Sequence, residues 1–138
     1  MNDPARSRKG LARLRRAVVP LSPRARIILD ACPIGLVVLT PDYDLLYANP
    51  AALALVGKTE EETFGRHVSE ALGPRAWEAI KPLADQAREG TGITSAAWID
   101  YPTGRRYVMR NFVPFHDVDG SMLGGFGFIQ DLTKIMEM

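Results

Sequence analysis

Cysteine, histidine and long apolar runs are scarce in this 138-residue sequence, and each shortage excludes a class of protein. Cys32 is the only cysteine, so the chain can form no internal disulfide and offers no cysteine-based zinc site. The longest mainly apolar runs, 34–39 and 51–56, are far short of the roughly 20 residues that a membrane helix needs. The basic N-terminus does not match a secretory signal, because Pro20 cuts the short apolar run 17–19. We therefore expect a protein of the cytoplasm.

Charge is divided unevenly along the chain, although the net charge is only +1. Residues 1–26 carry eight basic groups and one acidic group, whereas residues 27–138 carry nine basic and fifteen acidic groups. The composition is otherwise that of a soluble globular domain, with 46% hydrophobic and 24% charged residues. We interpret residues 1–21 as a basic arm. Its few apolar residues share one helical face with arginines around it, so it is either a solvated leader or a contact surface for nucleic acid or an anionic membrane.

Four helical segments and five strands are predicted, and they occur in blocks. Ser22, Asn49 and Thr59 stand at the starts of the first three helical segments, where their side chains can cap the helix. Pro82 lies inside the fourth segment and predicts either a kink there or a junction of two short helices. The predicted helices are 22–32, 51–56, 59–65 and 74–88, and the predicted strands are 34–40, 45–48, 94–100, 105–116 and 121–130. Blocks of this kind indicate an α+β fold with an antiparallel sheet.

Several short motifs, in this order and spacing, resemble a PAS domain over about residues 22–133. They are Ile34-Gly35-Leu36-Val37-Val38-Leu39, Tyr47-Ala48-Asn49-Pro50-Ala51-Ala52, Thr59-Glu60-Glu61-Glu62, Gly65-Arg66-His67-Val68, Pro114-Phe115-His116-Asp117-Val118-Asp119-Gly120, Gly124-Gly125-Phe126-Gly127 and Asp131-Leu132-Thr133. The resemblance implies a PAS fold: a five-stranded antiparallel sheet with short helices on one face that enclose a small cavity, and an N-terminal flanking helix. It also implies a sensory and dimerisation module of a bacterial-type signalling protein. The expected boundaries are 1–21 for the arm, 22–131 for the PAS domain and 132–138 for the start of a connector helix.

The residues that the best-known PAS cofactors need are missing from their expected places. Flavin-binding light sensors carry a cysteine in a region that matches 65–73 here, and Cys32 lies elsewhere and is expected to be a small buried residue. Haem-binding members use a histidine on the long helix, whereas His67 and His116 lie outside it and are expected to be surface or hydrogen-bonding residues. The sequence thus requires no cofactor, although a flavin or haem sensor with a different ligand set stays an alternative. Neither a catalytic constellation nor a metal site stands out, so we expect no enzyme.

The strand 105–116 is expected to line the cavity, but two arguments about its inward face disagree. The apolar pattern alone turns Tyr107, Met109, Val113 and Phe115 inward, whereas the family register turns Val108, Arg110 and Phe112 inward. We favour the family register. An inward Arg110 needs a counter-charge, so it holds either a small anionic ligand, such as a carboxylate, or an internal salt bridge, and an outward arginine is the remaining alternative. The expected contacts of an anionic or apolar ligand are Arg110, Phe112, Val108, Asn49, Tyr47 and Ile129.

The last strand predicts an aromatic outer face. The same register turns Leu123, Gly125, Gly127 and Ile129 inward and turns Met122, Phe126 and Phe128 outward. An aromatic face of this kind needs cover, either from the helix 22–31 of the same chain or from a second subunit. We predict a homodimer whose interface includes Ile27, Ile28, Met122, Phe126 and Phe128.

The end of the PAS region predicts how a signal would leave it. Asp131 is suited to cap a following helix, so Asp131 and Thr133 are expected to form the connector to an output domain or partner protein. Because the sequence ends five residues after Thr133, it is either an excised sensor module or a stand-alone protein. The leading hypothesis is a non-enzymatic sensory and dimerisation module whose terminal helices shift when a ligand binds. The alternative is a ligand-free adaptor for protein–protein interaction.

Overall fold

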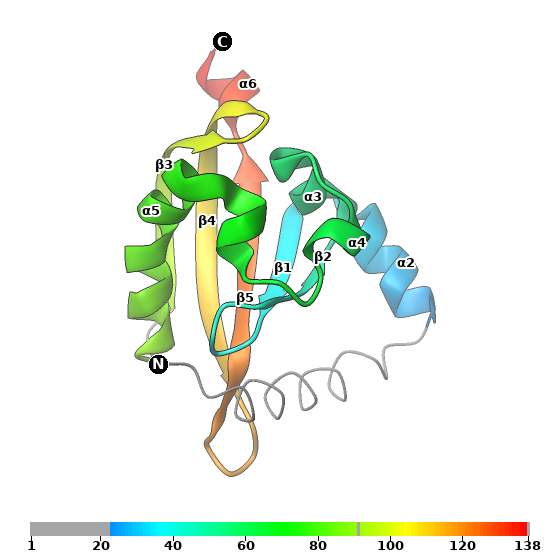
Figure 1. Ribbon diagram of the computed structural model, residues 1–138, viewed down its shortest axis with the longest axis vertical. Helices are drawn as coiled ribbons and strands as arrows, with labels where there is room; N and C mark the ends of the chain where they lie inside the picture. The colour runs from blue at the N-terminus through cyan, green and yellow to red at the C-terminus, as the bar shows by residue number, and fades with distance from the viewer. Residues whose placement is uncertain (1–22, 91, 138) are drawn as a thin grey trace.

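A computed structural model describes residues 23–90 and 92–137 of the chain. Its five strands form one antiparallel sheet in the order β2-β1-β5-β4-β3 (Figure 1). The strands are β1 (Gly35–Leu39), β2 (Leu45–Ala48), β3 (Ile93–Tyr101), β4 (Gly104–His116) and β5 (Met122–Asp131), and the helices are α2 (Pro23–Ala31), α3 (Pro50–Val56), α4 (Glu60–Thr63), α5 (Val68–Arg88) and α6 (Thr133–Met136). The predicted α+β fold is confirmed, and the predicted strands lie within about one residue of the observed ones. The predicted basic arm, with its contacts to nucleic acid or membrane, lies outside the described residues.

Capping residues define the short helices that follow β2. The Asn49 side chain accepts a hydrogen bond from the backbone at the start of α3, and Gly57 ends this helix with a left-handed φ of 68°. Thr59 and Glu62 form the predicted capping box of α4. These short helices lie over β1 and β2, while α5 packs on β3 and β4, so that all three cover one face of the sheet (Figure 1).

The long helix α5 begins earlier than predicted and is interrupted at a different residue. Gly73 has non-helical backbone angles (φ 80°, ψ 166°), which glycine adopts without a steric penalty, and Pro74 then suits the first turn of the second half. Gly73 is the one residue of α5 with non-helical backbone angles, so the junction of two short helices, one of the alternatives predicted at Pro82, is wrong. In the described part of the chain, neither α5 nor any other helix is long and apolar enough to cross a membrane.

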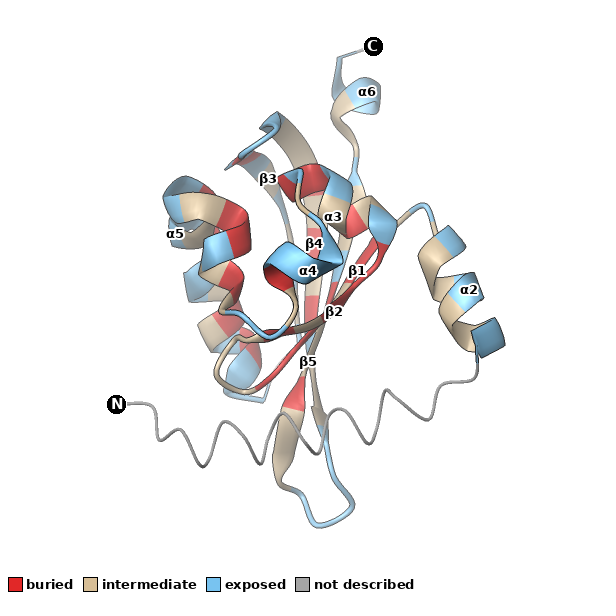
Figure 2. Cartoon of the chain, turned by 45° about the vertical axis from the view of Figure 1, so that its right-hand side comes forward, coloured by how far each residue is buried: buried red, intermediate tan, exposed pale blue. Residues whose placement is uncertain are grey.

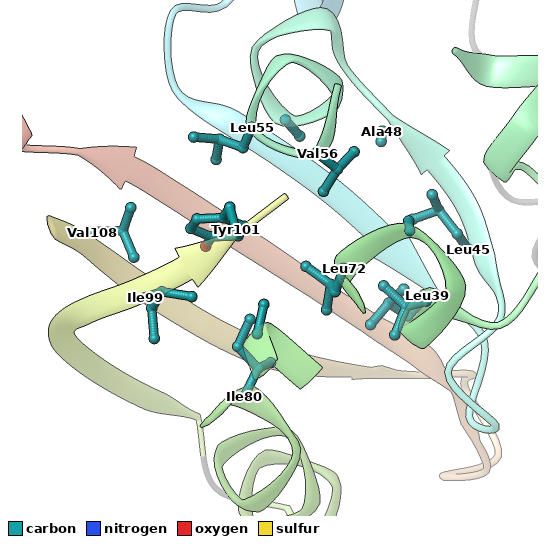
Figure 3. Close-up of a cluster of buried hydrophobic side chains, with 14 of the residues drawn as sticks. Leu39, Leu45, Ala48, Leu55, Val56, Leu72, Ile80, Ile99, Tyr101 and Val108 are labelled. Atoms are coloured by element: carbon teal, nitrogen blue, oxygen red, sulfur yellow. The ribbon is translucent and has the colours of Figure 1, made fainter. Parts of the chain in front are cut away.

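The main core lies between the sheet and the helices that cover it. Buried residues of α5 recur every three or four positions, as expected for one apolar helix face: Val68, Ala71, Leu72, Ala76, Ile80, Ala84 and Ala87. Figure 3 shows Leu55 and Val56 of α3 opposite Leu72 of α5, with Tyr101 of β3 between the helices. We call this side of the sheet the inner face.

Helix α2 docks on the opposite, outer face mainly through polar contacts. The Tyr47 hydroxyl donates a hydrogen bond to Asp30 at 2.6 Å, and Asp30 is paired with Arg26 of the same helix. Arg26 also pairs with Glu60 of α4 and lies over the Tyr47 ring. Leu29 is the residue of α2 that packs on the outer-face cluster. The helix contains no fully buried residue (Figure 2).

Much of the outer face remains exposed within residues 23–137. Trp98, Val113 and Phe128 are about 40% exposed, at 40%, 43% and 41%, and Ile27 and Ile28 of α2 are 66% and 70% exposed. Helix α2 contributes Leu29 rather than Ile27 or Ile28 to the contacts on this face, because it turns its Arg26–Asp30 side toward the domain. Cover of the rest of the face by a second subunit stays a prediction.

A bulge in β5 changes which side chains face the core. Phe115 pairs with Gly124 and His116 pairs with Met122, so Leu123 is an extra residue in this strand. Leu123 packs with the outer-face cluster, whereas Met122 lines a pocket on the inner face. The predicted inward Leu123 and outward Met122 are both wrong, because strict alternation fails at a bulge.

Both ends of the fold lie at one end of the two neighbouring strands β1 and β5. The first residue of β1, Gly35, pairs with Ile129 near the end of β5. Helix α2 precedes β1 and helix α6 follows β5, so the chain enters and leaves the sheet side by side.

Gly127 of β5 stands where the inner face has no room for a side chain. A Cβ atom here would lie 2.6 Å from Val37 Cγ2 and 3.3 Å from a ring carbon of Phe112. We expect Gly127→Ala to lower the free energy of unfolding by about 1–3 kcal/mol through overpacking, measured by urea denaturation. Gly92→Ala, where the nearest atom is 3.4 Å away, is the control and should change stability little. Val37→Ala should restore part of the loss, and a Gly127→Ala protein as stable as the original would contradict the argument.

Candidate ligand-binding cup

Alternate residues of β4 face the helices. Val108, Arg110 and Phe112 are 0%, 2% and 8% exposed, while Tyr107 and Met109 on the outer face are only partly buried. The inward face expected from the family register is confirmed, and the apolar-pattern alternative is wrong. The pattern misleads because the outer face of this sheet is also apolar.

Arg110 is a buried cation with few partners. Its Nη2 donates a hydrogen bond to Ser95 Oγ at 3.0 Å, but Nε and Nη1 have no hydrogen-bond partner among the described residues. None of the ion pairs in that part of the chain involves Arg110. Within the described residues, two of the alternatives for Arg110 are therefore excluded: the side chain does not point outward, and no internal salt bridge holds it. Burial lowers the pKa of the guanidinium, and the nearby Tyr101 acts in the opposite direction, but arginine stays charged at neutral pH.

Tyr101 brings a second unsatisfied polar atom to this region. The residue is 5% exposed, and its hydroxyl has no hydrogen-bond partner within residues 23–90 and 92–137. Burial raises the pKa of this phenol to about 12, so the hydroxyl is protonated at neutral pH and can donate a hydrogen bond. The ring lies between Val108 and Leu72 in the main core (Figure 3).

A small cavity adjoins Tyr101 on the inner face. Its volume is about 30 Å³, which is room for about one or two water molecules. Apart from Tyr101 its walls are apolar, and they include Val37, Leu45, Ala52 and Ile129. Ile129 is also the residue that pairs with Arg110 across the β4–β5 ladder. Arg110 and Ser95 do not line the cavity themselves, but Tyr101, which does, acts electrostatically on Arg110. We call the cavity together with Arg110, Tyr101 and Ser95 the cup.

Tyr47 and Asn49, two of the predicted ligand contacts, hold the fold together instead. Asn49 is 0% exposed, and its amide makes four hydrogen bonds of 2.9–3.1 Å to the backbone of Leu36, Ala52, Leu29 and Ile34. Tyr47 uses its hydroxyl to bind Asp30 of α2 on the outer face. The inner face thus brings together Val108, Arg110, Phe112 and Ile129, and it leaves out Tyr47 and Asn49.

The predicted interface residues occupy several environments. Phe128, Ile27 and Ile28 are exposed, whereas Phe126 is half-buried and stacks against Phe115 with ring centroids 4.6 Å apart. Met122 lines an inner-face pocket between α5 and the sheet. The outer face therefore carries aromatic side chains of three neighbouring strands, β3, β4 and β5: Trp98, Tyr107, Phe115, Phe126 and Phe128.

Asp131 and Thr133 join β5 to α6 and also bind the start of α6 to β4. Asp131 Oδ1 accepts hydrogen bonds from the backbone N–H and the hydroxyl of Thr133. Thr133 Oγ1 accepts a hydrogen bond from Tyr107 N–H at 3.0 Å, and Leu132 N–H donates to the Tyr107 carbonyl at 2.8 Å. The strand that carries Arg110 is thus directly hydrogen-bonded to the first residues of the connector.

The residues considered for cofactor ligation have other roles here. His67 caps α5 by accepting a backbone N–H, and its ring packs edge-on against Tyr43 and Trp77. Cys32 is a free, half-buried thiol, and His116 is exposed at the end of β4. The described residues contain no cluster of three or more His, Cys, Asp or Glu side chains suited to a metal ion.

The two polar neighbours of Arg110, Ser95 and Tyr101, were not predicted from the sequence. Both belong to β3, and both share the inner face with Ile99 because they are an even number of residues apart. This period of two was readable from the sequence. The sequence did not show that a tyrosine near the end of one strand would lie near an arginine in the middle of the next.

The fold is that of a known family. A family model described as "PAS fold" matches residues 29–135, so the chain belongs to the PAS family. A curated relative is the aerobic respiration control sensor protein ArcB of Escherichia coli K12, which is 29% identical over 112 residues. That alignment covers 79% of this chain and 14% of the relative, so the chain spans about one seventh of the relative's length.

Solved structures show the same fold. The PAS domain of a Colwellia psychrerythraea protein superposes with a TM-score of 0.68 at 21% identity, covering 80% of this chain and 96% of that one. VqmA of Vibrio cholerae, solved in a complex with a ligand and DNA, superposes with a TM-score of 0.67 at 23% identity, covering 81% of this chain and 51% of that one. The likeness extends to the fold, and the expected PAS resemblance is confirmed.

Proposed function

We propose that this PAS domain is a sensory module of a signalling protein and that a small molecule binds in its cup. The buried Arg110 guanidinium, with two unpartnered nitrogens among the described residues, is the main support. A buried charge without a counter-charge is costly, so a ligand that satisfies it binds with a corresponding advantage. The curated relative is named as a sensor protein, which agrees with this role. We propose binding rather than catalysis, because arginine, serine and tyrosine, the polar groups described at the cup, do not act as general bases in these protonation states.

The signal would travel from the cup to α6 through β4. Arg110 lies on β4, and β4 is hydrogen-bonded through Tyr107 to Leu132 and Thr133 at the start of α6. A ligand that shifts β4 by a fraction of an ångström would change these bonds. An output domain or partner protein attached to the connector would then respond to the change. The size of the response would depend on how much more tightly the ligand binds one arrangement of β4 and α6 than the other.

Filling the cavity is a direct test of ligand binding. A thermal-shift screen of neutral, acidic and aromatic metabolites should find compounds that stabilise the protein, and Ala52→Leu should abolish their effect because Ala52 lines the cavity. Ala54→Leu on the exposed side of the same helix is the matched control and should keep it. If Ala52→Leu does not fold, Ala48→Val in the same wall replaces it. Compounds that stabilise the Ala52 variant equally would bind elsewhere, which would refute the cup as the site.

We also propose that the exposed outer face forms a homodimer. Trp98, Val113 and Phe128 project from neighbouring strands and remain about 40% exposed, at 40%, 43% and 41%. Phe128→Asp should convert the dimer to a monomer, because it places a charge in a desolvated interface. Val118→Asp in the exposed β4–β5 turn is the control and should leave the dimer intact. Sedimentation analysis at ~100 µM measures both, and a monomeric unmodified protein at this concentration would rule out the dimer.

The small volume of the cavity, about 30 Å³, also favours a second candidate function, a ligand-free interaction adaptor. In that case the cup is simply a packed core and the outer face carries the function. Failure of the whole metabolite screen, together with loss of dimerisation in Phe128→Asp, would favour this adaptor over the sensor.

A further inference from the structure

We propose that the ligand of the cup is a short-chain monocarboxylate, with its carboxylate at Arg110 and Tyr101 and its alkyl chain in the apolar cavity. This inference rests on the proposed function, because it names the chemical class that the same cup accepts. Three kinds of observation support it: the unsatisfied donors, the single buried charge, and the size and polarity of the cavity.

The unsatisfied atoms at the cup are hydrogen-bond donors. Arg110 Nε and Nη1 can only donate, and the protonated Tyr101 hydroxyl can donate as well. A group that satisfies all of them has to accept several hydrogen bonds at once. A carboxylate offers two oxygens with about four acceptor positions, whereas an amide offers one such oxygen and adds two donors that find no acceptor here. Donor chemistry therefore selects a carboxylate over its neutral amide.

The charge at the cup selects a monoanion. Arg110 is the only buried charged residue in the described part of the chain, and no described carboxylate pairs with it. One negative charge on the ligand neutralises this guanidinium. A dianion, such as a dicarboxylate or a phosphate monoester, would leave one negative charge buried without a partner, which is costly.

The cavity selects a short apolar chain. Its volume of about 30 Å³ admits only a few heavy atoms, and its walls beside Tyr101 are Val37, Leu45, Ala52 and Ile129 among other apolar residues. Small inorganic anions would leave these walls in contact with no apolar group. A two- or three-carbon acid places its charge at the polar end and its methyl or ethyl group against the apolar walls.

An open cleft next to the cavity offers a route for such a ligand. This cleft has a volume of about 460 Å³, and Tyr101 and Leu72 line both the cleft and the cavity. Arg75 and Arg105 lie on its walls together with Asp100. The two arginines favour the approach of an anion toward Tyr101, which lines both spaces.

Calorimetric titration of the dialysed full chain with sodium acetate, propionate and butyrate tests the inference. Propionamide and disodium succinate, at matched ionic strength, are the neutral and dianionic probes. We expect at least one of the three acids to bind with a dissociation constant between about 10 µM and 1 mM, since about five heavy atoms support no tighter binding. The amide and the dianion should bind at least about tenfold more weakly, because each loses a charge-assisted contact or buries an unpaired charge.

Substitutions then place the carboxylate. Arg110→Gln should weaken binding of the acid by at least about tenfold, and Tyr101→Phe should weaken it by about three- to tenfold. Arg66→Gln removes the same charge from an exposed position outside the cleft and should leave affinity unchanged. Circular dichroism verifies that each variant is folded, and the ligand panel on the unmodified protein stands without any variant.

The outcomes separate this inference from the proposed function. If propionamide binds as tightly as propionate, or if no acid binds below about 10 mM, the monocarboxylate is refuted. If a neutral compound binds and Ala52→Leu blocks it while Arg110→Gln does not, the cup is a ligand site but not one for carboxylates. If propionate binds equally well to Ala52→Leu and Arg110→Gln, the ligand lies elsewhere and both proposals fail.

Discussion

Replacing Arg110 with methionine should raise the free energy of unfolding of the ligand-free protein by about 2–4 kcal/mol. The side chain is 2% exposed, and within the described residues its charge is balanced by no carboxylate. Methionine fills a similar, elongated space without a charge and adapts to irregular surroundings. Urea denaturation of the dialysed proteins measures the change. We expect this gain because a buried charge that is kept for an anion destabilises the protein when the anion is absent.

A matched substitution shows whether the burial of Arg110 causes the expected change in the free energy of unfolding. Arg105→Met makes the same change at an exposed position of β4 and should alter stability by less than about 0.5 kcal/mol. Saturating propionate should stabilise the unmodified protein but not Arg110→Met, so the difference between the two proteins should shrink as the ligand is added. A loss of more than about 2 kcal/mol in Arg110→Met would mean that the guanidinium is a structural group, against our proposal.

Asn49→Ala should have the opposite and larger effect, a loss of about 3–5 kcal/mol in the free energy of unfolding. The amide is 0% exposed, caps α3, and binds the backbone on both sides of β1's start. Its removal leaves buried N–H and C=O groups without partners, and each such group costs more than an ordinary hydrogen bond contributes. Thermal and urea unfolding measure the loss, and accelerated hydrogen exchange at Leu36 N–H locates it.

Two further variants separate the roles of this amide. Asn49→Asp keeps the oxygen that accepts hydrogen bonds from Leu36 and Ala52 but loses the N–H groups that donate to Leu29 and Ile34. Its free energy of unfolding should therefore lie between those of the alanine variant and the original protein. Thr59→Ala removes an ordinary exposed cap on α4 and should cost about 1 kcal/mol. If Asn49→Ala costs no more than Thr59→Ala, Asn49 is only a cap.

The elements that the sequence predicted well are those bounded by local signals. The capping box at Thr59 and the cap at Asn49 act between residues three apart, so the local amino-acid sequence is sufficient to predict them. The strand boundaries were likewise readable, because turn residues separate apolar runs. The predicted start of the fourth helix at Pro74 coincides with the break at Gly73, whereas the helical turns of 68–72 before the break were not predicted.

The cup was predicted only in part because its chemistry depends on contacts between distant residues. Arg110 was recognised as an inward residue, but only the family register placed it there, since both faces of β4 carry apolar side chains. The polar partners of Arg110 come from β3, and the roles of Tyr47 and Asn49 depend on how α2 docks. Local periodicity contains none of this information, because it describes which face a residue occupies and not which residue of another strand it meets.

The pairing of Gly35 with Ile129 also determines how the domain responds to mechanical load. Tension applied between α2 and α6 pulls on adjacent ends of β1 and β5, so it opens the ladder one hydrogen bond at a time instead of shearing all of them together. A domain attached through these two ends should therefore yield at low force. The same closeness of its ends allows the domain to be spliced into a surface loop of another protein with little distortion of either fold.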